Sequence, residues 1–234
     1  MIRVWARGAT AAGVVELDGE ESHHLEVRRV EVGAAVVVLD GVGGVGRGVV
    51  EAVGKRARVR IDTVSTVPPP AALVLLVGAG DRDRFLWLVE KAVEAGVTRL
   101  VPVETARSRN VASRIRAEHL DRMVRRAAEA QKQAGGAWNL SIESPQPLEQ
   151  AIGTIGAGRR WLADLGAEPA PRLEAADPVV VAIGPEGGFT DEERAALLAA
   201  RFTPVRFGAR TMRFETAALA AAVVAGLARK ETDG

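Results

Sequence analysis

The chain has 234 residues, 47% of them hydrophobic, and a formal net charge of +1. This is enough to bury a full core, in one large domain or in a small domain followed by a larger one. No cysteine is present, which excludes disulfides and thiolate metal sites. The sequence has no signal-peptide pattern and no run of roughly twenty apolar residues, so we expect a cytoplasmic protein without a membrane span.

The first domain, residues 1–67, has the pattern of a small β-barrel. Glycine turns separate short apolar runs that predict strands over 3–5, 13–16, 35–39, 47–53 and 57–64. A short helix is expected over 22–29, with Ser22 as its N-cap. Three consecutive prolines, 68–70, then form a stiff spacer before a second domain over residues 71–234.

The second domain alternates strands and helices. Unbroken apolar runs predict strands over 73–77, 99–103, 160–163, 179–183 and 204–207. Helical spacing predicts helices over 83–95, 116–134, 190–200 and 215–229, the third of them opened by a capping box of Thr190 and Glu193. Such strands are typical of a parallel sheet covered on both faces, so we expect an α/β fold.

Seven arginines and only two acidic residues lie between residues 107 and 126. Arginine suits planar, two-pronged contact with phosphate, so this segment is a candidate nucleic-acid contact. The alternative is a solvated helix face. The candidate RNA contacts are Arg107, Arg109, Arg114, Arg116, Arg122 and Arg125.

Other chemistries have little support. His23 and His24 are adjacent and His119 lies alone, so no spacing matches a zinc site and no metal is expected. The sequence lacks a Gly-x-Ser-x-Gly elbow, and without cysteine a Cys-His nucleophile is excluded. Covalent hydrolase chemistry is therefore not indicated.

Two glycine turns carry most of the functional information. The first, residues 183–189, follows one predicted strand, and the second, residues 207–217, follows the next. Ligands in open α/β sheets bind outside the carboxyl ends of the strands, so the two turns predict the walls of one cleft. Glu186 and the absence of lysine argue against phosphate and favour a neutral or cationic small molecule. The alternative is that the glycines only make tight turns.

The two motifs, Gly-Pro-Glu-Gly-Gly and Gly-x-x-x-Met-Arg-x-Glu-Thr-Ala, resemble the signature of the RsmE family. These enzymes are 16S ribosomal RNA uracil-N3 methyltransferases of the SPOUT superfamily. Segments 24–29, 90–97 and 132–135 match further family patterns, so the resemblance extends over nearly the whole chain. Departures occur at Gly136, Leu140, Asp164 and Phe214.

The resemblance implies a PUA-like β-barrel that binds RNA, followed by a SPOUT-type domain whose parallel sheet is tied in a trefoil knot. It implies S-adenosylmethionine (S-adenosyl-L-methionine, SAM) as cofactor and a homodimer, for which the apolar stripe of Leu219, Val223 and Leu227 is a candidate surface. The expected partner is 16S ribosomal RNA in the assembled small subunit. Two alternatives stay open: a non-catalytic RNA-binding protein of the same fold, and a SPOUT enzyme acting on another RNA position.

The resemblance also assigns site residues. Arg213 is the expected catalytic group, because an arginine aimed at uracil stabilises the negative charge left when N3 loses its proton. Glu215 is expected to orient Arg213 or to help remove that proton; alternatively, the two residues only pair to hold the loop. Further RNA contacts are expected at His24, Arg28, Arg29 and Arg210. The expected cofactor residues are Leu162, Ala163, Asp164, Leu165, Gly166, Ile183, Gly184, Pro185, Glu186, Gly187, Gly188, Phe207, Gly208, Met212 and Ala217.

Overall fold

A computed structural model describes residues 2–6, 11–109 and 111–228. The chain divides into two compact units. The N-terminal unit comprises Met1–Pro70 together with Gln131–Asn139, and the C-terminal unit comprises Ala71–Ala130 and Leu140–Gly234. The sequence pattern placed 131–139 in the second domain, whereas in the structure this segment groups with the first.

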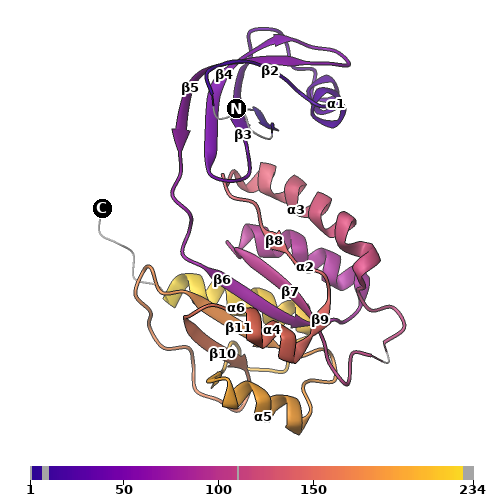
Figure 1. Cartoon of the computed structure of the whole chain (residues 1–234), viewed down its shortest axis with the longest axis vertical. Coiled ribbons are helices and arrows are strands. Elements are labelled where there is room, and N and C mark those ends of the chain that lie inside the picture. The colour runs from indigo at the N-terminus through magenta and orange to yellow at the C-terminus, as the bar shows by residue number, and fades with distance from the viewer. Residues whose placement is uncertain (1, 7–10, 110, 229–234) are drawn as a thin grey trace. The chain divides into compact units, whose positions relative to one another are not determined.

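The N-terminal unit is a five-stranded sheet with one short helix (Figure 1). The sheet order is β1-β3-β4-β5-β2, with β1 and β3 parallel and the other pairs antiparallel. The elements are β1 (Ile2–Trp5), β2 (Gly13–Glu16), α1 (Gly19–Val27), β3 (Ala35–Leu39), β4 (Gly44–Ala52) and β5 (Arg58–Thr66).

Helix α1 begins three residues earlier than predicted, because Asp18 and not Ser22 caps it. The Asp18 carboxylate accepts a hydrogen bond from the Glu21 backbone N–H at 2.8 Å. Ser22 lies inside the helix and is buried, where its hydroxyl accepts a bond from the Ala57 N–H at 3.0 Å.

Segment 131–139 joins the N-terminal unit through polar contacts. Lys132 Nζ lies 2.7 Å from a Glu21 carboxylate oxygen, and both side chains are about 5% exposed or less. The Trp138 indole N–H donates to the Val67 carbonyl at 2.9 Å. A buried charge is tolerated only when it is paired, so Lys132 and Glu21 depend on each other.

The C-terminal unit is built on a parallel sheet, as predicted, and this sheet has seven strands where five were expected. Its order is β12-β10-β11-β6-β7-β8, and β9 also pairs with β7. The strands are β6 (Leu73–Gly78), β7 (Arg99–Glu104), β8 (Ser141–Ile142), β9 (Gln146–Pro147), β10 (Arg159–Ala163), β11 (Val179–Ile183) and β12 (Thr203–Val205).

Helices cover both faces of this sheet (Figure 1). One core contains residues of α2, α3 and α6, and the other contains residues of α4 and α5. The helices are α2 (Arg82–Glu94), α3 (Leu120–Ala134), α4 (Leu148–Thr154), α5 (Asp191–Ala199) and α6 (Phe214–Ala228). Arg229, the predicted end of α6, lies outside the described residues.

Several boundaries differ from the prediction. Helix α3 starts at Leu120, after a separate 3-10 turn over Ala117–His119, and α4, β8 and β9 were not predicted. Thr190 and Glu193 form the predicted capping box. The trefoil knot stays a prediction. Within the described ranges, no helix is long and apolar enough to cross a membrane.

Candidate active site

The two predicted glycine turns meet in one cleft of the C-terminal unit, with a volume of about 230 Å³. Three loops line it, each leaving the carboxyl end of a parallel strand, as expected for an open α/β sheet. They follow β10 (the β10 loop), β11 (the β11 loop) and β12 (the β12 loop). The lining residues are Ala163, Asp164, Leu165, Ile183, Gly184, Pro185, Glu186, Gly188, Phe207, Gly208, Arg210, Thr211, Met212, Phe214 and Ala217.

The β11 loop requires its glycines. The Gly188 N–H donates to the Pro185 carbonyl at 2.8 Å, which closes a tight turn, and Gly188 has a φ of 72°. A Cβ on Gly184 would lie 3.0 Å from the Gly188 Cα and 3.1 Å from the Phe189 N. A side chain at Gly184 would therefore crowd the backbone of Gly188 and Phe189, and these atoms can move only if the loop changes its conformation.

Two glycines that the sequence analysis missed, Gly78 and Gly80, allow neighbouring residues to pack closely against the β11 loop and Phe214. A Cβ on Gly78, at the end of β6, would lie 2.4 Å from the Pro185 N, and one on Gly80 would lie 2.6 Å from the Phe214 ring. The Asp81 N–H also reaches a Glu186 carboxylate oxygen at 3.4 Å. Glycine directly after an apolar strand was the available signal, since it marks a close backbone approach.

The β10 loop contributes a fixed carboxylate. One Asp164 oxygen accepts from the Gly166 N–H at 2.9 Å, and the other accepts from Arg194 at 2.6 Å. These bonds, with the Gly166 N–H contributing most, hold the pKa of Asp164 below its ordinary value. The cleft therefore presents the carboxylates of Asp164 and Glu186, one arginine and no lysine.

The β12 loop is anchored by aromatic contacts at its two ends. Phe207 packs on Trp161 with ring centroids 6.0 Å apart, and Phe214 stacks on Phe85 at 6.1 Å. Between these anchors, Arg210, Thr211 and Arg213 are exposed. Their side chains make no hydrogen bond or ion pair with any residue that the structure describes.

Most of the expected cofactor residues line the cleft, and three do not. Leu162 is 1% exposed and lies in the core on the side of α4 and α5. Gly166 instead donates to Asp164, and Gly187 is covered by the side chain of Arg107. Arg210, expected as an RNA contact, lines the cleft, together with Thr211 and Phe214, which lie in the predicted wall 207–217 but were not among the expected cofactor residues.

The expected catalytic pair lies beside the cleft rather than in its lining. Arg213 is exposed, whereas Glu215 is 8% exposed and one of its carboxylate oxygens has no hydrogen-bond partner. No ion pair joins Arg213 to Glu215 in the described part of the chain. The alternative that the two residues pair to hold the loop therefore has no contact to support it.

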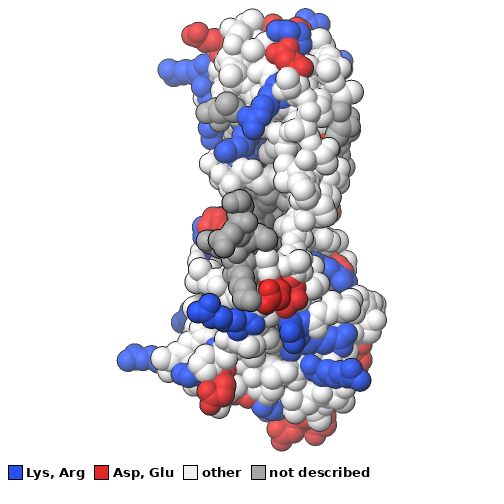
Figure 2. All heavy atoms as spheres, turned by 90° about the vertical axis from the view of Figure 1, so that its left-hand side faces the viewer, with Lys and Arg blue, Asp and Glu red and all other residues white. Residues whose placement is uncertain are grey.

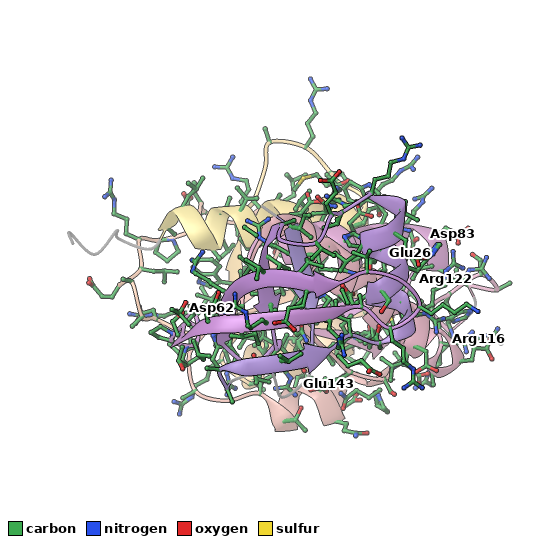
Figure 3. All side chains as sticks on the ribbon, turned by 90° about the horizontal axis from the view of Figure 1, so that it is seen from above. Glu26, Asp62, Asp83, Arg116, Arg122 and Glu143 are labelled. Atoms are coloured by element: carbon green, nitrogen blue, oxygen red, sulfur yellow. The ribbon has the colours of Figure 1, made fainter. Side chains whose placement is uncertain are left out.

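Of the six RNA-binding arginines predicted between residues 107 and 125, Arg109 is exposed and the other five fall into two groups. Three have partners: Arg107 donates to the Gly187 carbonyl, Arg114 to the Arg109 carbonyl at 2.7 Å and Arg116 to the Ala112 carbonyl at 3.4 Å. Arg122 and Arg125, on α3, are exposed and have no partner among the described side chains. Arg116 and Arg122 extend away from the ribbon on the same side (Figure 3).

Within the N-terminal unit, His24 is half-buried in the last turn of α1, and Arg28 and Arg29 follow it exposed. On one face of the C-terminal unit, basic side chains form a loose band, whereas acidic ones gather at its end (Figure 2). No group of three or more His, Asp or Glu among the described residues is placed to hold a metal ion.

Comparison with known proteins agrees with this geometry. Residues 67–226 match the model of an RNA methyltransferase domain, and residues 17–61 match that of an RNA methyltransferase PUA domain. The chain is 31% identical to ribosomal RNA small subunit methyltransferase E of Synechocystis, over 87% of this chain and 69% of that protein. The same enzyme of Mycobacterium tuberculosis is 31% identical, over 94% and 88%.

Comparison with solved structures also identifies methyltransferases as similar proteins. The methyltransferase E of Neisseria gonorrhoeae, crystallised with SAM, aligns over 95% of both chains with a TM-score of 0.85 and 25% identity. A methyltransferase of Legionella pneumophila in complex with SAM aligns over 97% of this chain and 98% of that one, with a TM-score of 0.83 and 26% identity. The chain therefore belongs to the RNA methyltransferase family of ribosomal RNA small subunit methyltransferase E.

Proposed function

We propose that this protein uses SAM to methylate N3 of a uridine in 16S ribosomal RNA of the small subunit, in the cytoplasm. One observation carries the proposal: the β11 and β12 loops, which contain the two glycine motifs of the family, line a single cleft with the β10 loop at the carboxyl edge of the sheet. The relative from Neisseria gonorrhoeae, which aligns along nearly the whole chain, was crystallised with SAM.

The residues of the cleft fit this cofactor. SAM carries a positively charged sulfonium, and the cleft presents the carboxylate of Glu186, beside an Asp164 that is paired with Arg194, where a phosphate site would have lysine. The volume of about 230 Å³ is below the roughly 300–1,000 Å³ of typical small-molecule sites, so part of the ligand would extend toward the mouth. When bound, SAM supplies an activated methyl group.

The chemistry at uracil assigns a role to the β12 loop. N3 lies on the Watson-Crick edge, so the base must be unpaired or flipped out of its helix. Loss of the N3 proton leaves negative charge on the neighbouring carbonyl oxygens. Arg213 is exposed next to the lining residues Met212 and Phe214 and has no described partner, so it is free to meet that charge.

Glu215 has the environment of a positioning group or of a proton acceptor. It is buried in the first turn of α6, and one of its carboxylate oxygens has no hydrogen-bond partner. A buried carboxylate without a partner is costly, so a bound base or a neighbouring chain would offer it a compensating contact. We retain both roles for Glu215 as part of the proposal.

The RNA contacts are proposed on both units. Arg122 and Arg125 present two unpaired guanidinium groups on α3, as a phosphate contact requires. His24, Arg28 and Arg29 lie in or directly after the last turn of α1, within the segment that matches the PUA domain model. The assembled small subunit is the proposed form of the substrate.

The homodimer is proposed on the outer face of α6. Ala218, Ala221 and Ala222 of this helix are fully buried, whereas Val223 is 45% and Leu227 81% exposed. Large apolar side chains at four-residue spacing on an exposed helix face indicate a partner surface. Sedimentation at micromolar concentration should give a dimer, and Leu227→Glu should shift it toward monomer; a monomeric wild-type protein would contradict the proposal.

The function is tested on small ribosomal subunits from cells that lack the protein. The purified protein and SAM should restore one methylated uridine, and mass spectrometry of nucleoside digests reports the atom that is modified. Methylation elsewhere would identify a related enzyme of different specificity. Calorimetry that detected RNA binding without SAM binding would indicate a non-catalytic protein that has retained the fold.

A further inference from the structure

Arg107 is not placed as a free phosphate contact. Its guanidinium donates to the carbonyl of Gly187, in the β11 loop. Its aliphatic stem covers Gly187 closely, because a Cβ there would lie 3.1 Å from Arg107 Cδ and 3.3 Å from Arg107 Cβ. The β11 loop is therefore held from the outside by a residue that does not line the cleft.

Ala106, the residue before Arg107, contacts Glu193 in the first turn of α5, directly after the β11 loop. The Ala106 N–H donates to one Glu193 carboxylate oxygen at 2.7 Å, and the other oxygen accepts from the Thr190 N–H at 2.9 Å. Glu193 thus joins segment 105–107 to the capping box of α5. Residues 184–190 are held at both Gly187 and Thr190.

The base of Arg107 is rigid. Thr105 and Ser108 are 1% or less exposed and bond reciprocally, since each backbone N–H donates to the other hydroxyl, at 2.9 and 3.1 Å. This turn directly follows β7. Arg107 therefore projects from a backbone segment that is held on both sides.

Residues 113–115, farther along the arginine-rich segment, contact Gly80 and Asp81, which adjoin the β11 loop. The Ser113 hydroxyl donates to Asp81 at 2.7 Å, and the Ile115 N–H donates to the Gly80 carbonyl at 3.0 Å. Asp81 in turn donates its N–H to Glu186. The segment that carries Arg109 and Arg114 is thus attached at both ends to residues that hold the β11 loop.

We propose that Arg107 is a positioning residue whose contact with Gly187 holds the β11 loop in the arrangement that binds SAM. This inference rests on the proposed function. Without Arg107, the Gly187 carbonyl loses its hydrogen bond, and the β11 loop is left with its contacts to Gly78, Asp81 and Glu193.

The test measures SAM affinity by calorimetry and the single-turnover methylation rate at saturating SAM. Arg107→Ala should weaken SAM binding by about fivefold or more, while the rate at saturating SAM falls less than the affinity. Arg107→Lys should recover part of the affinity, because an ammonium can still donate to the Gly187 carbonyl.

Two control variants separate the contact of Arg107 with Gly187 from the general effect of removing an arginine. Arg109→Ala, two residues away, should weaken RNA binding but leave SAM affinity without RNA unchanged, and Arg172→Ala controls for loss of an exposed arginine. Arg107→Met keeps the aliphatic stem but removes the donor, so it should lose part of the affinity even if Arg107→Ala fails to fold. SAM affinity equal to wild type in Arg107→Ala and Arg107→Met would overturn the inference, as would a fall in the rate at saturating SAM as large as the fall in affinity. A wild-type chain that does not bind SAM would overturn the proposed function as well.

Discussion

The β11 and β12 loops line the same cleft but are built in opposite ways. The β11 loop is held from several sides, by Gly78 beneath it, Asp81 at Glu186, Arg107 at Gly187 and the capping box of Thr190. The β12 loop is anchored by aromatic contacts at its ends, and among the described residues the side chains of Arg210, Thr211 and Arg213 between them have no hydrogen-bond or ion-pair partner. One loop is preorganised, and the other presents unpaired side chains.

This difference separates two tasks. A loop whose backbone is fixed before the ligand arrives loses little entropy on binding, which suits recognition of a cofactor. Unpaired arginines suit groups whose charge develops only when RNA is bound, because no internal ion pair has to be broken first. We therefore expect changes in the β11 loop to affect binding and changes in the β12 loop to affect rate.

The largest effect is expected at Arg213. If it stabilises charge on uracil, Arg213→Ala should lower the single-turnover methylation rate by about a hundredfold or more, with little change in SAM affinity. Arg213→Lys should recover only part of the rate, because a point charge does not reproduce a planar, two-pronged contact.

The control for Arg213 is Glu215→Gln, measured at saturating SAM beside a direct binding assay. If Arg213 only held the loop, Arg213→Ala would lose SAM binding together with rate, and Glu215→Gln would behave in the same way. That pattern would assign both residues to loop structure and remove the distinction between the two loops.

The two glycine turns give the next largest effect and compare the loops directly. Gly184→Val places its side chain against the backbone of Gly188 and Phe189, whereas Gly208→Val meets the end of the flexible Met212 side chain at 3.1 Å. Overpacking costs ~1–3 kcal/mol, so Gly184→Val should weaken SAM binding by roughly tenfold or more. Gly208→Val should weaken it less. Calorimetry that found the reverse order would contradict the rigid β11 loop.

Part of this site could be predicted from sequence because its signals are local. Thr190 and Glu193 lie three residues apart, so the capping box depends only on a short helix start. The two glycine motifs each follow a strong apolar strand, and the parallel sheet then brings them to one edge. The contact of Arg107 with Gly187 joins residues 80 positions apart, and no local pattern encodes it.

The remaining misses have physical causes. Asp18 replaced Ser22 as N-cap because the buried Ser22 hydroxyl is used by the backbone of Ala57, 35 residues away. Segment 131–139 continues α3 in sequence, yet the buried pair of Lys132 and Glu21 assigns it to the N-terminal unit. The short α4, β8 and β9 lack the length on which periodicity depends.

A smaller effect is expected from the unpaired arginines of α3, which contrast with the held Arg107. Arg122→Gln combined with Arg125→Gln should weaken RNA binding and reduce its salt slope by ~0.7–0.9 per lost phosphate contact. SAM affinity should not change, because neither residue lies at the cleft. Filter binding across a salt series measures this slope. A slope of RNA affinity against salt equal to wild type would mean that both arginines lie on a solvated helix face and contact no phosphate.

The smallest effect concerns the third wall of the cleft, where Asp164 is held by Gly166 and Arg194. The pKa of Asp164 is lowered in the folded state, so its contribution to stability is present above the unfolded pKa of ~3.9 and is lost as the pH falls through the folded value. Asp164→Asn should lower the melting temperature by about 2 °C at neutral pH, since a partly exposed ion pair contributes little. The difference between the two melting curves should begin to shrink below about pH 4 and should vanish only below the lowered folded pKa of Asp164, where the wild-type side chain also becomes neutral. Thermal unfolding monitored by circular dichroism between neutral and acidic pH would measure this difference. A difference that stayed constant across that range would mean that Asp164 supports the β10 loop through its shape and hydrogen bonds rather than through its charge.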